Sequence, residues 1–320
     1  MPLNPLVAKD LKQLKSGGNK YDCFAGGEYV DLRGAALAPY KNLDLSRFDR
    51  LAKIARGLIF ATVENSQSGH PGGSSSKVEQ FLALTLGGTL AFDPADPKNP
   101  GRDRVIWSAG HCTPLLFGGQ ALLYEALRRT GRQFSEAVVD CVLPEQLLRF
   151  RRLDGPPGHA ESQYPFCDYS TGPSGHGFCA AGGMALSHRA SGLATKVWVF
   201  MGDAESEEGM TYEARNVLAA TGADNIVVSL DYNHFGIDGP VEEVMSAPYL
   251  NYWLGFGWNV IEADGHNVNE LLYAYDLAAK GFKNSRPTVV VAHTIKGKAY
   301  GKLENSSASH GSPICRRPCL

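Results

Sequence analysis

The sequence lacks the features that mark membrane, secreted or nucleic-acid-binding proteins. No apolar run approaches 18 residues, so the sequence predicts no membrane-spanning helix. The N-terminal stretch MPLNPLVAKDLKQLK has no apolar core of a signal peptide. The formal net charge is only −2, which gives no electrostatic reason to expect nucleic acid or an anionic membrane as a partner.

Cysteine is scarce and unpatterned. The seven cysteines are an odd number without a CxxC pair, which favours buried thiols in a reducing cytoplasm over a disulfide framework. Cys315 and Cys319 lie in a tail that looks exposed, and we expect no metal-binding role for them. The remaining composition, 43% apolar residues with 36 glycines in 320 residues, is typical of a loop-rich α/β enzyme.

The most informative stretch is 197–233, which predicts two strands joined by a helix. The apolar runs 197–201 and 226–230 are short enough for buried strands, and Gly222 ends the helix between them. The first strand stops at Gly202-Asp203, and the second is followed by Asn233. Because the carboxyl ends of parallel strands line one ligand crevice, Asp203 and Asn233 can meet at one edge of the sheet.

One carboxylate and one amide oxygen suit Mg²⁺, which takes few protein oxygens and completes its shell with water and phosphate oxygens. The pair therefore predicts a site for a metal-bound diphosphate. Gly202, which has no side chain, would let the backbone come close to that diphosphate. A simpler interpretation is that Asp203 caps a helix and Asn233 occupies a turn, and for either motif alone this would be the better one.

Other segments supply further strands, helices and loops. We expect strands at 105–107, 254–261 and 288–292, and helices at 75–86, 115–129, 178–192 and 269–283; residues 135–153 also look helical. The long Gly/Pro-rich loop 154–177 is of the kind that is usually functional. Four histidines lie in glycine-flanked loops: His70, His111, His159 and His310. A near-neutral pKa makes histidine the usual proton carrier, although a lone histidine is more often structural.

These motifs together resemble the thiamine-diphosphate-dependent transketolase family, over roughly residues 45–313. The motifs that resemble those of the family are GDA at 202–204 with Asn233 about 30 residues later, SGHPG at 68–72, SAGH at 108–111, PGH at 157–159, TGPSGHG at 171–177 and HGSP at 310–313. The resemblance implies an α/β thiamine-diphosphate-binding fold, with a mostly parallel sheet covered by helices on both faces. Ala204, Ser174 and His176 depart from the family pattern.

The resemblance also implies roles for single residues. It makes His70, His111, His159 and His310 the catalytic histidines, which contact donor hydroxyls or cofactor diphosphate. The metal ligands would be Asp203, Asn233 and the backbone carbonyl of Phe235, holding Mg²⁺ or in its place Ca²⁺ or Mn²⁺. The implied thiamine-diphosphate-binding residues are His111, Gly172, Pro173, Ser174, Gly202, Ala204, Glu208, Asn233, Lys296 and His310. Glu208 would also reach across an interface, and Lys296 could equally be a solvated loop lysine.

A transketolase needs a second, pyrimidine-binding half that supplies the glutamate which activates the cofactor. We therefore expect residues 44–313 to be the diphosphate-binding domain, residues 1–43 an N-terminal arm that packs on the domain or on a partner, and residues 314–320 a tail. The expected protein is the N-terminal subunit of a split transketolase, cytoplasmic and assembled as α2β2 with a pyrimidine-domain subunit. It would transfer a two-carbon ketol unit from a ketose, phosphorylated or not, to an aldose.

Two alternatives stay open at this point. One is a subunit of a 2-oxoacid decarboxylase or dehydrogenase that resembles its E1-α chain. The other is a truncated homologue that kept the fold without activity. The histidine motifs, which suit polyol substrates, disfavour the first, and the intact Asp203 and Asn233 disfavour the second.

Overall fold

The core of the protein is one parallel sheet of six strands. In this computed structural model, the described residues are 27–132, 140–245 and 249–315. Across the sheet the strands run in the order β1-β5-β6-β4-β3-β2, and every neighbouring pair is parallel. Their bounds are Tyr29–Asp31 (β1), Arg104–Trp107 (β2), Val197–Gly202 (β3), Ile226–Tyr232 (β4), Asn259–Asp264 (β5) and Thr288–His293 (β6).

Alternate residues of the strands enter two separate apolar cores, because successive side chains of a strand point to opposite faces. In β2, Val105 and Trp107 pack in one core and Ile106 packs in the other. In β3, Trp198 and Phe200 belong to the first core. Both faces of the sheet are therefore buried, as the near-continuous apolar runs of a parallel sheet require.

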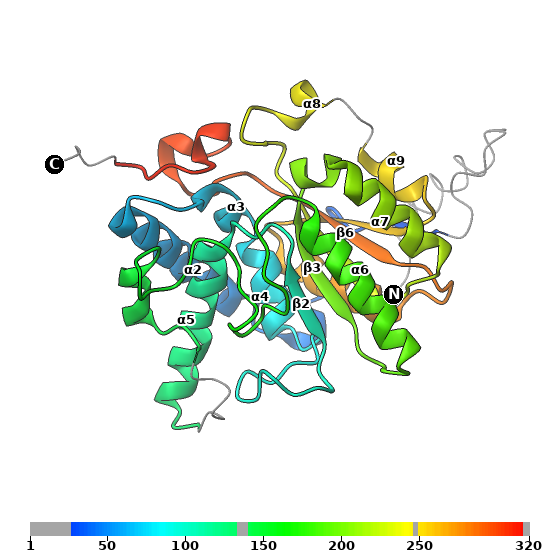
Figure 1. Ribbon diagram of the computed structural model, residues 1–320, viewed down its shortest axis with the longest axis horizontal. Coiled ribbons are helices and arrows are strands. Elements are labelled where there is room, and N and C mark those ends of the chain that lie inside the picture. The colour runs from blue at the N-terminus through cyan, green and yellow to red at the C-terminus, as the bar shows by residue number, and fades with distance from the viewer. Residues whose placement is uncertain (1–26, 133–139, 246–248, 316–320) are drawn as a thin grey trace.

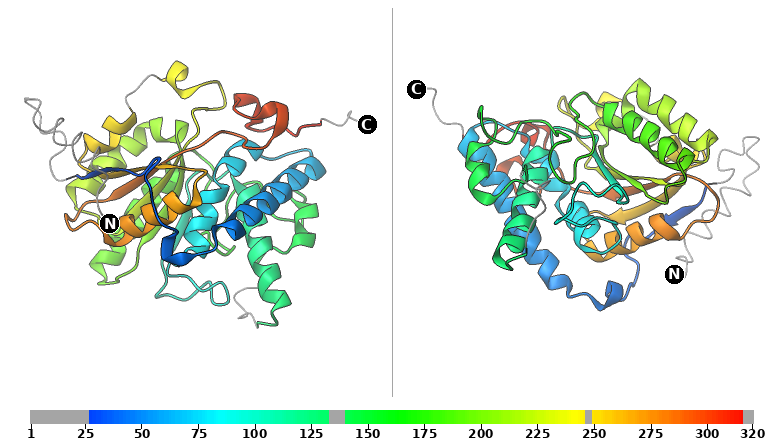
Figure 2. Two further views of the ribbon diagram at one scale, coloured as in Figure 1. Left: turned by 180° about the vertical axis from the view of Figure 1, so that it is seen from behind. Right: turned by 60° about the horizontal axis from the view of Figure 1, so that its bottom comes forward.

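Helices cover both faces (Figures 1 and 2). The first core contains residues of α2 (Leu45–Ser66), α4 (Val78–Leu86), α5 (Thr113–Arg129) and α10 (Val268–Lys280). The second contains residues of α6 (His176–Ala190), α7 (Gly209–Ala220) and α9 (Tyr249–Leu254). Two short helices, α3 (Pro71–Ser76) and α8 (Val241–Val244), lie in loops. The predicted α/β fold with a parallel sheet and two covered faces is confirmed.

Some predicted elements have different bounds. The helix expected at 75–86 is two helices, α3 and α4, separated at Lys77. The strand expected at 254–261 starts only at Asn259, because Gly255 and Gly257, the latter with φ +79°, follow α9. In the stretch 135–153, a 3-10 helix spans Pro144–Arg149, whereas 135–139 lie outside the described residues.

Part of the expected N-terminal arm, residues 1–43, contributes a strand to the sheet itself. β1 is its edge strand, and Tyr29, Val30 and Asp31 pair with Val260, Ile261 and Glu262 of β5. Glu262 fixes this edge by accepting from Tyr29 Oη, from Arg33 Nη2 at 3.2 Å and from His293 Nε2 at 2.8 Å. Residues 1–26 of the expected arm and 316–320 of the expected tail lie outside the described residues, as does Cys319.

No helix in the described ranges is both long and apolar enough to cross a bilayer.

A buried charged cluster ties α2 and α4 to the loops after β5 and β6. The Arg56 guanidinium of α2 binds the Glu79 carboxylate of α4 twice, at 2.7 and 2.6 Å. The same carboxylate contacts His266 Nδ1 at 3.1 Å. His266 Nε2 accepts the backbone N–H of Ile295 at 2.9 Å, so the proton of the neutral ring lies on Nδ1 and is donated to Glu79.

We predict that Glu79→Gln lowers the free energy of unfolding by about 3 kcal/mol, because it leaves the Arg56 charge buried without its counter-ion. The control is Glu125→Gln on α5, which removes a partner of the exposed Arg129 and should leave the stability nearly unchanged. Chemical denaturation of both variants measures the difference. Equal losses would mean that the buried cluster adds nothing beyond a surface pair.

Candidate active site

The candidate site lies at the carboxyl edge of the sheet, where four neighbouring strands end. The loops after β2, β3, β4 and β6 carry, respectively, His111, Asp203, Asn233 and Lys296. Together with His310 these residues line one cavity of about 380 Å³. Segments far apart in the chain thus meet at a single opening, as expected for an open parallel sheet.

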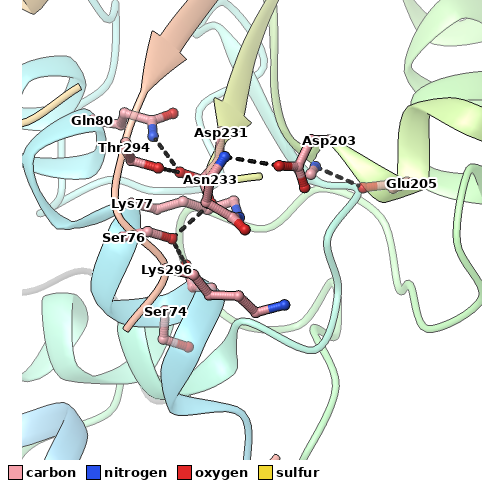
Figure 3. A network of polar contacts seen from close by, with 12 residues as sticks. Ser74, Ser76, Lys77, Gln80, Asp203, Glu205, Asp231, Asn233, Thr294 and Lys296 are labelled. Carbon is pink, nitrogen blue, oxygen red and sulfur yellow. Dashed lines mark hydrogen bonds and ion pairs between the residues drawn. The ribbon is translucent and has the colours of Figure 1, made fainter. Parts of the chain in front are cut away.

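The ends of β3 and β4 are joined by the Asp203 carboxylate. Its Oδ2 accepts the backbone N–H of Asn233 at 2.8 Å (Figure 3). It also accepts the backbone N–H of His234 at 2.6 Å. The predicted meeting of Asp203 and Asn233 is therefore confirmed, and their strands are direct neighbours. Their role as metal ligands stays a prediction.

Asp203 also caps the short helix that follows it, as the simpler interpretation of the sequence suggested. Its Oδ1 accepts the N–H of Ala204 at 2.9 Å, at the start of the 3-10 helix Ala204–Glu207. Burial, together with the nearby Asp231 carboxylate, raises the pKa of Asp203 to about 6. Ala204 is not among the described residues with positive φ, so its methyl group is accommodated without backbone strain.

Lys296 lies inside the cavity rather than in solvent. Its side chain reaches across to the loop after β4, where Nζ donates to the carbonyls of Phe235 at 2.7 Å and Gly236 at 2.8 Å. The Phe235 carbonyl, which the family resemblance makes a metal ligand, therefore accepts a hydrogen bond from the Lys296 ammonium group in this structure. Burial lowers the pKa of Lys296 to about 8.

The four candidate histidines form one cluster. The ring centroid of His70 lies 5.1 Å from that of His111, 5.4 Å from that of His310 and 6.3 Å from that of His159. The centroids of His111 and His310 are themselves 5.1 Å apart. A close approach of glycine allows His70 and His310 to gather here. A Cβ on Gly72 would lie 2.7 Å from Ser309 Oγ, which is closer than real Cβ contacts come.

All four imidazoles are held in the neutral form. Burial lowers the pKa of His70 to about 4 and that of His310 to about 3, with Arg151, Lys296 and the other rings adding repulsion. Burial also lowers the pKa of His111, well below the usual value, and that of the more exposed His159. Lys296 Nζ is 3.2 Å from His310 Nδ1; a lysine only donates, so the His310 proton lies on Nε2.

The loop 154–177, which carries the predicted cofactor residues Gly172, Pro173 and Ser174, is hydrogen-bonded to the segment that carries His111. Thr171 Oγ1 donates to the Trp107 carbonyl at 2.6 Å, and Ala160 N donates to the Gly110 carbonyl at 2.9 Å. Gly172 then lies against His159, since a Cβ on it would be 3.7 Å from that ring.

The other predicted cofactor residues differ in their exposure. Ser174 and Glu208 are exposed and line the cavity, as does the half-buried Gly202. Pro173 is exposed on the same loop as Ser174. An exposed carboxylate at Glu208 is what a contact across an interface would need, although that role stays a prediction.

Glu205 is a functional candidate that the sequence interpretation passed over. Its buried carboxylate accepts from Ser108 Oγ, from Gly175 N at 3.0 Å and from Gly202 N at 3.1 Å. It thereby fastens together the loop after β2, the loop before α6 and the end of β3.

Lys77 and Asp231, which form a buried ion pair beneath Asn233, were missed as well. No local pattern marks this pair, because Lys77 lies among the polar residues Ser76, Glu79 and Gln80 and its partner lies in a distant strand.

We predict that the rings of His70 and His310 stay neutral at pH 5, with titration midpoints of about 4 and about 3. Histidine NMR signals, assigned from His70→Asn and His310→Asn spectra, measure these midpoints. Since the unfolded chain binds these protons near pH 6.5, the stability that the two rings contribute is lost as the pH falls from about 6.5 through the folded midpoints. Midpoints above pH 6 for both rings would contradict the described burial.

Comparison with known proteins identifies the family. The sequence profile described as "Transketolase, thiamine diphosphate binding domain" matches residues 48–317. The chain is 33% identical over 271 residues to the 6-deoxy-6-sulfo-D-fructose transketolase subunit SqwG of Clostridium sp. (strain MSTE9), covering 82% of this chain and 90% of that protein. It is 30% identical over 264 residues to an apulose-4-phosphate transketolase subunit of Phocaeicola vulgatus, covering 82% of this chain and 88% of that protein.

Longer relatives are matched only in part. The transketolase of Homo sapiens is 30% identical over 285 residues, and the match covers 87% of this chain but 42% of that protein. The crystal structure of the Campylobacter jejuni transketolase superposes with a TM-score of 0.75 at 27% identity, covering 85% of this chain and 41% of that one. The fold, the site geometry and these matches agree, and the chain belongs to the transketolase family, of which it contains the thiamine-diphosphate-binding domain.

Proposed function

We propose that this chain is the diphosphate-binding, N-terminal subunit of a split transketolase. In this function it binds thiamine diphosphate through Mg²⁺ and transfers a two-carbon ketol unit from a ketose to an aldose. The single observation that carries the proposal is the cavity in which Asp203, Asn233 and Lys296 face the histidine cluster. Two relatives support the split arrangement. Both are named as transketolase subunits, and the match covers about nine tenths of the length of each.

The residues present fit the group that the family implies. Asp203, the Asn233 amide and the Phe235 carbonyl are hard oxygen donors of the kind that Mg²⁺ takes. Lys296, His111 and His310 line the same cavity and offer nitrogen donors to an anionic diphosphate.

One polar atom in the histidine cluster also points to a ligand. His70 Nδ1 is buried and lacks a hydrogen-bond partner among the described residues. A buried polar atom without a hydrogen-bond partner costs free energy. The cluster therefore favours a ligand that forms a hydrogen bond with His70 Nδ1.

When bound, thiamine diphosphate supplies the electron sink that allows a carbon–carbon bond beside a carbonyl to break. The chain's own residues would position the substrate and move protons. A neutral imidazole can accept a proton at one ring nitrogen and donate one at the other, so His70, His159 and His310 are suited to a substrate with several hydroxyl groups. This requirement favours a polyol over the 2-oxo acid of the alternative function.

We expect an α2β2 assembly with a pyrimidine-domain subunit, and a cytoplasmic location. The names of the two subunit relatives each contain a sugar with an anionic group, a sulfonate in one and a phosphate in the other. An anionic ketose is therefore the first donor class to test.

Replacing Asp203 by alanine should abolish Mg²⁺-dependent binding of thiamine diphosphate, because the carboxylate both joins β3 to β4 and is the charged ligand of the proposed metal set. Calorimetric titration of the assembled protein measures the affinity. Asp224→Ala is the matched control. This exposed carboxylate precedes β4, at the amino ends of the strands and away from the cavity, so its removal should leave the affinity unchanged. Unchanged binding in Asp203→Ala would remove the metal assignment.

The purified chain should not transfer ketol units by itself, whereas the chain co-expressed with a pyrimidine-domain partner should. The physical reason is that the family's cofactor lies between two domains, and Glu208 and Ile237 leave one wall of the cavity exposed. A panel of ketose donors with and without a terminal phosphate or sulfonate tests both the requirement and the substrate class. Robust transfer by the single chain would refute the split arrangement.

A further inference from the structure

The carboxylate of Asp231, fully buried at the end of β4, is the centre of a polar network beneath the candidate metal site (Figure 3). Five side chains donate to it. Those on Oδ2 are Ser76 at 2.7 Å, Lys77 at 2.8 Å and Asn233 at 2.7 Å, and those on Oδ1 are Thr294 at 2.5 Å and Gln80 at 3.2 Å. Such a set of donors fixes the carboxylate in one orientation.

The network determines which end of the Asn233 amide is free for a metal. The Asn233 Nδ2 group donates to Asp231, so the amide cannot turn over without losing that bond. Its Oδ1 lies at the other end, where it accepts the Phe235 N–H at 3.1 Å. Only the oxygen of an amide is a useful ligand for Mg²⁺, and fixing the amide nitrogen on Asp231 therefore fixes the ligand.

Lys77 is the cation among these five donors. Its side chain is 2% exposed, and it sits at the break between α3 and α4, from which Nζ reaches Asp231 and the wall of the cavity. Burial alone would lower the pKa of Lys77, but the Asp231 carboxylate outweighs that effect and raises it. A buried carboxylate without a cation would be costly, so Lys77 is what keeps Asp231 charged and in place.

We propose that Lys77 is a positioning residue of the metal site, which acts through Asp231 to hold the Asn233 amide with its oxygen toward the cation. This inference rests on the proposed function, because it concerns the same metal site. Lys77 would touch neither the metal nor the substrate. It would set the affinity of the site through Asp231, the group that is hydrogen-bonded to the metal ligand Asn233.

The experiment measures Mn²⁺ binding to the full-length chain assembled with its partner, in the presence of thiamine diphosphate, from the EPR signal of free Mn²⁺. Lys77→Met should weaken Mn²⁺ binding about tenfold, the lower end of the range of about 10- to 100-fold found when a group bonded directly to a metal ligand, here Asp231, is disturbed. Lys302→Met, which removes an exposed lysine, should change it less than about twofold.

A milder pair of variants covers the case in which Lys77→Met fails to fold. Ser76→Ala removes one hydrogen bond to Asp231 without changing any charge, and should weaken Mn²⁺ binding about threefold. Ser74→Ala is its matched control. Ser74 is equally buried on the same helix but donates to the His70 carbonyl, so Mn²⁺ binding should be unchanged.

A double-mutant cycle separates positioning from a general loss of structure. If Lys77 acts through Asn233, Lys77→Met should have no further effect on Mn²⁺ affinity in an Asn233→Ala background. Effects that add in the double variant, or a Lys77→Met or Ser76→Ala variant that binds like the wild type, would overturn the inference and leave the proposed function intact. A wild-type protein that does not bind Mn²⁺ would overturn both.

Discussion

The hydrogen bonds from the backbone of Asn233 and His234 to the Asp203 carboxylate are the contacts on which the site depends. They join the ends of two neighbouring strands, so that a carboxylate, an amide and a backbone carbonyl converge at one point of the sheet edge. A parallel sheet buried on both faces makes this edge rigid, because each strand is fixed by neighbours and by two apolar cores. The loops can then carry reactive groups without themselves forming a core.

The electrostatics of the cavity follow from burial and from a balance of opposite charges. Asp203 and Asp231 place two carboxylates close together, and Lys77 and Lys296 place two ammonium groups among them. Fixed, buried charges interact more strongly than solvated ones with an anionic diphosphate and its cation. Around this charged centre the histidines remain neutral, so one part of the site is suited to holding charge and the other to moving protons.

The strand ends and the histidines could be predicted from the sequence because each is a local signal. A short apolar run followed by Gly-Asp, or a glycine-flanked histidine, can be recognised within a few residues. The network around Asp231 could not, because Lys77 and Asp231 are 154 residues apart in the chain, and Ser108 and Glu205 are 97 apart. Lys77, among Ser76, Glu79 and Gln80, predicts only a solvated side chain until the Asp231 carboxylate is placed beside it.

The same reasoning explains the remaining differences. Lys296 was equally compatible with a solvated loop, since its partners, the carbonyls of Phe235 and Gly236, leave no mark in the sequence. The edge strand β1 has only three residues in a polar segment, and it is defined by pairing with β5 rather than by its own composition. Pairing partners and buried counter-ions are tertiary facts, and local patterns do not contain them.

The most direct test of the account is the position of the metal. Anomalous scattering from crystals grown with Mn²⁺ and thiamine diphosphate would locate it. We predict a peak bounded by the Asp203 carboxylate, the Asn233 Oδ1 atom and the Phe235 carbonyl, with the Lys296 ammonium moved off that carbonyl. A peak elsewhere, or a Lys296 that still occupies the Phe235 carbonyl with the metal bound, would contradict it.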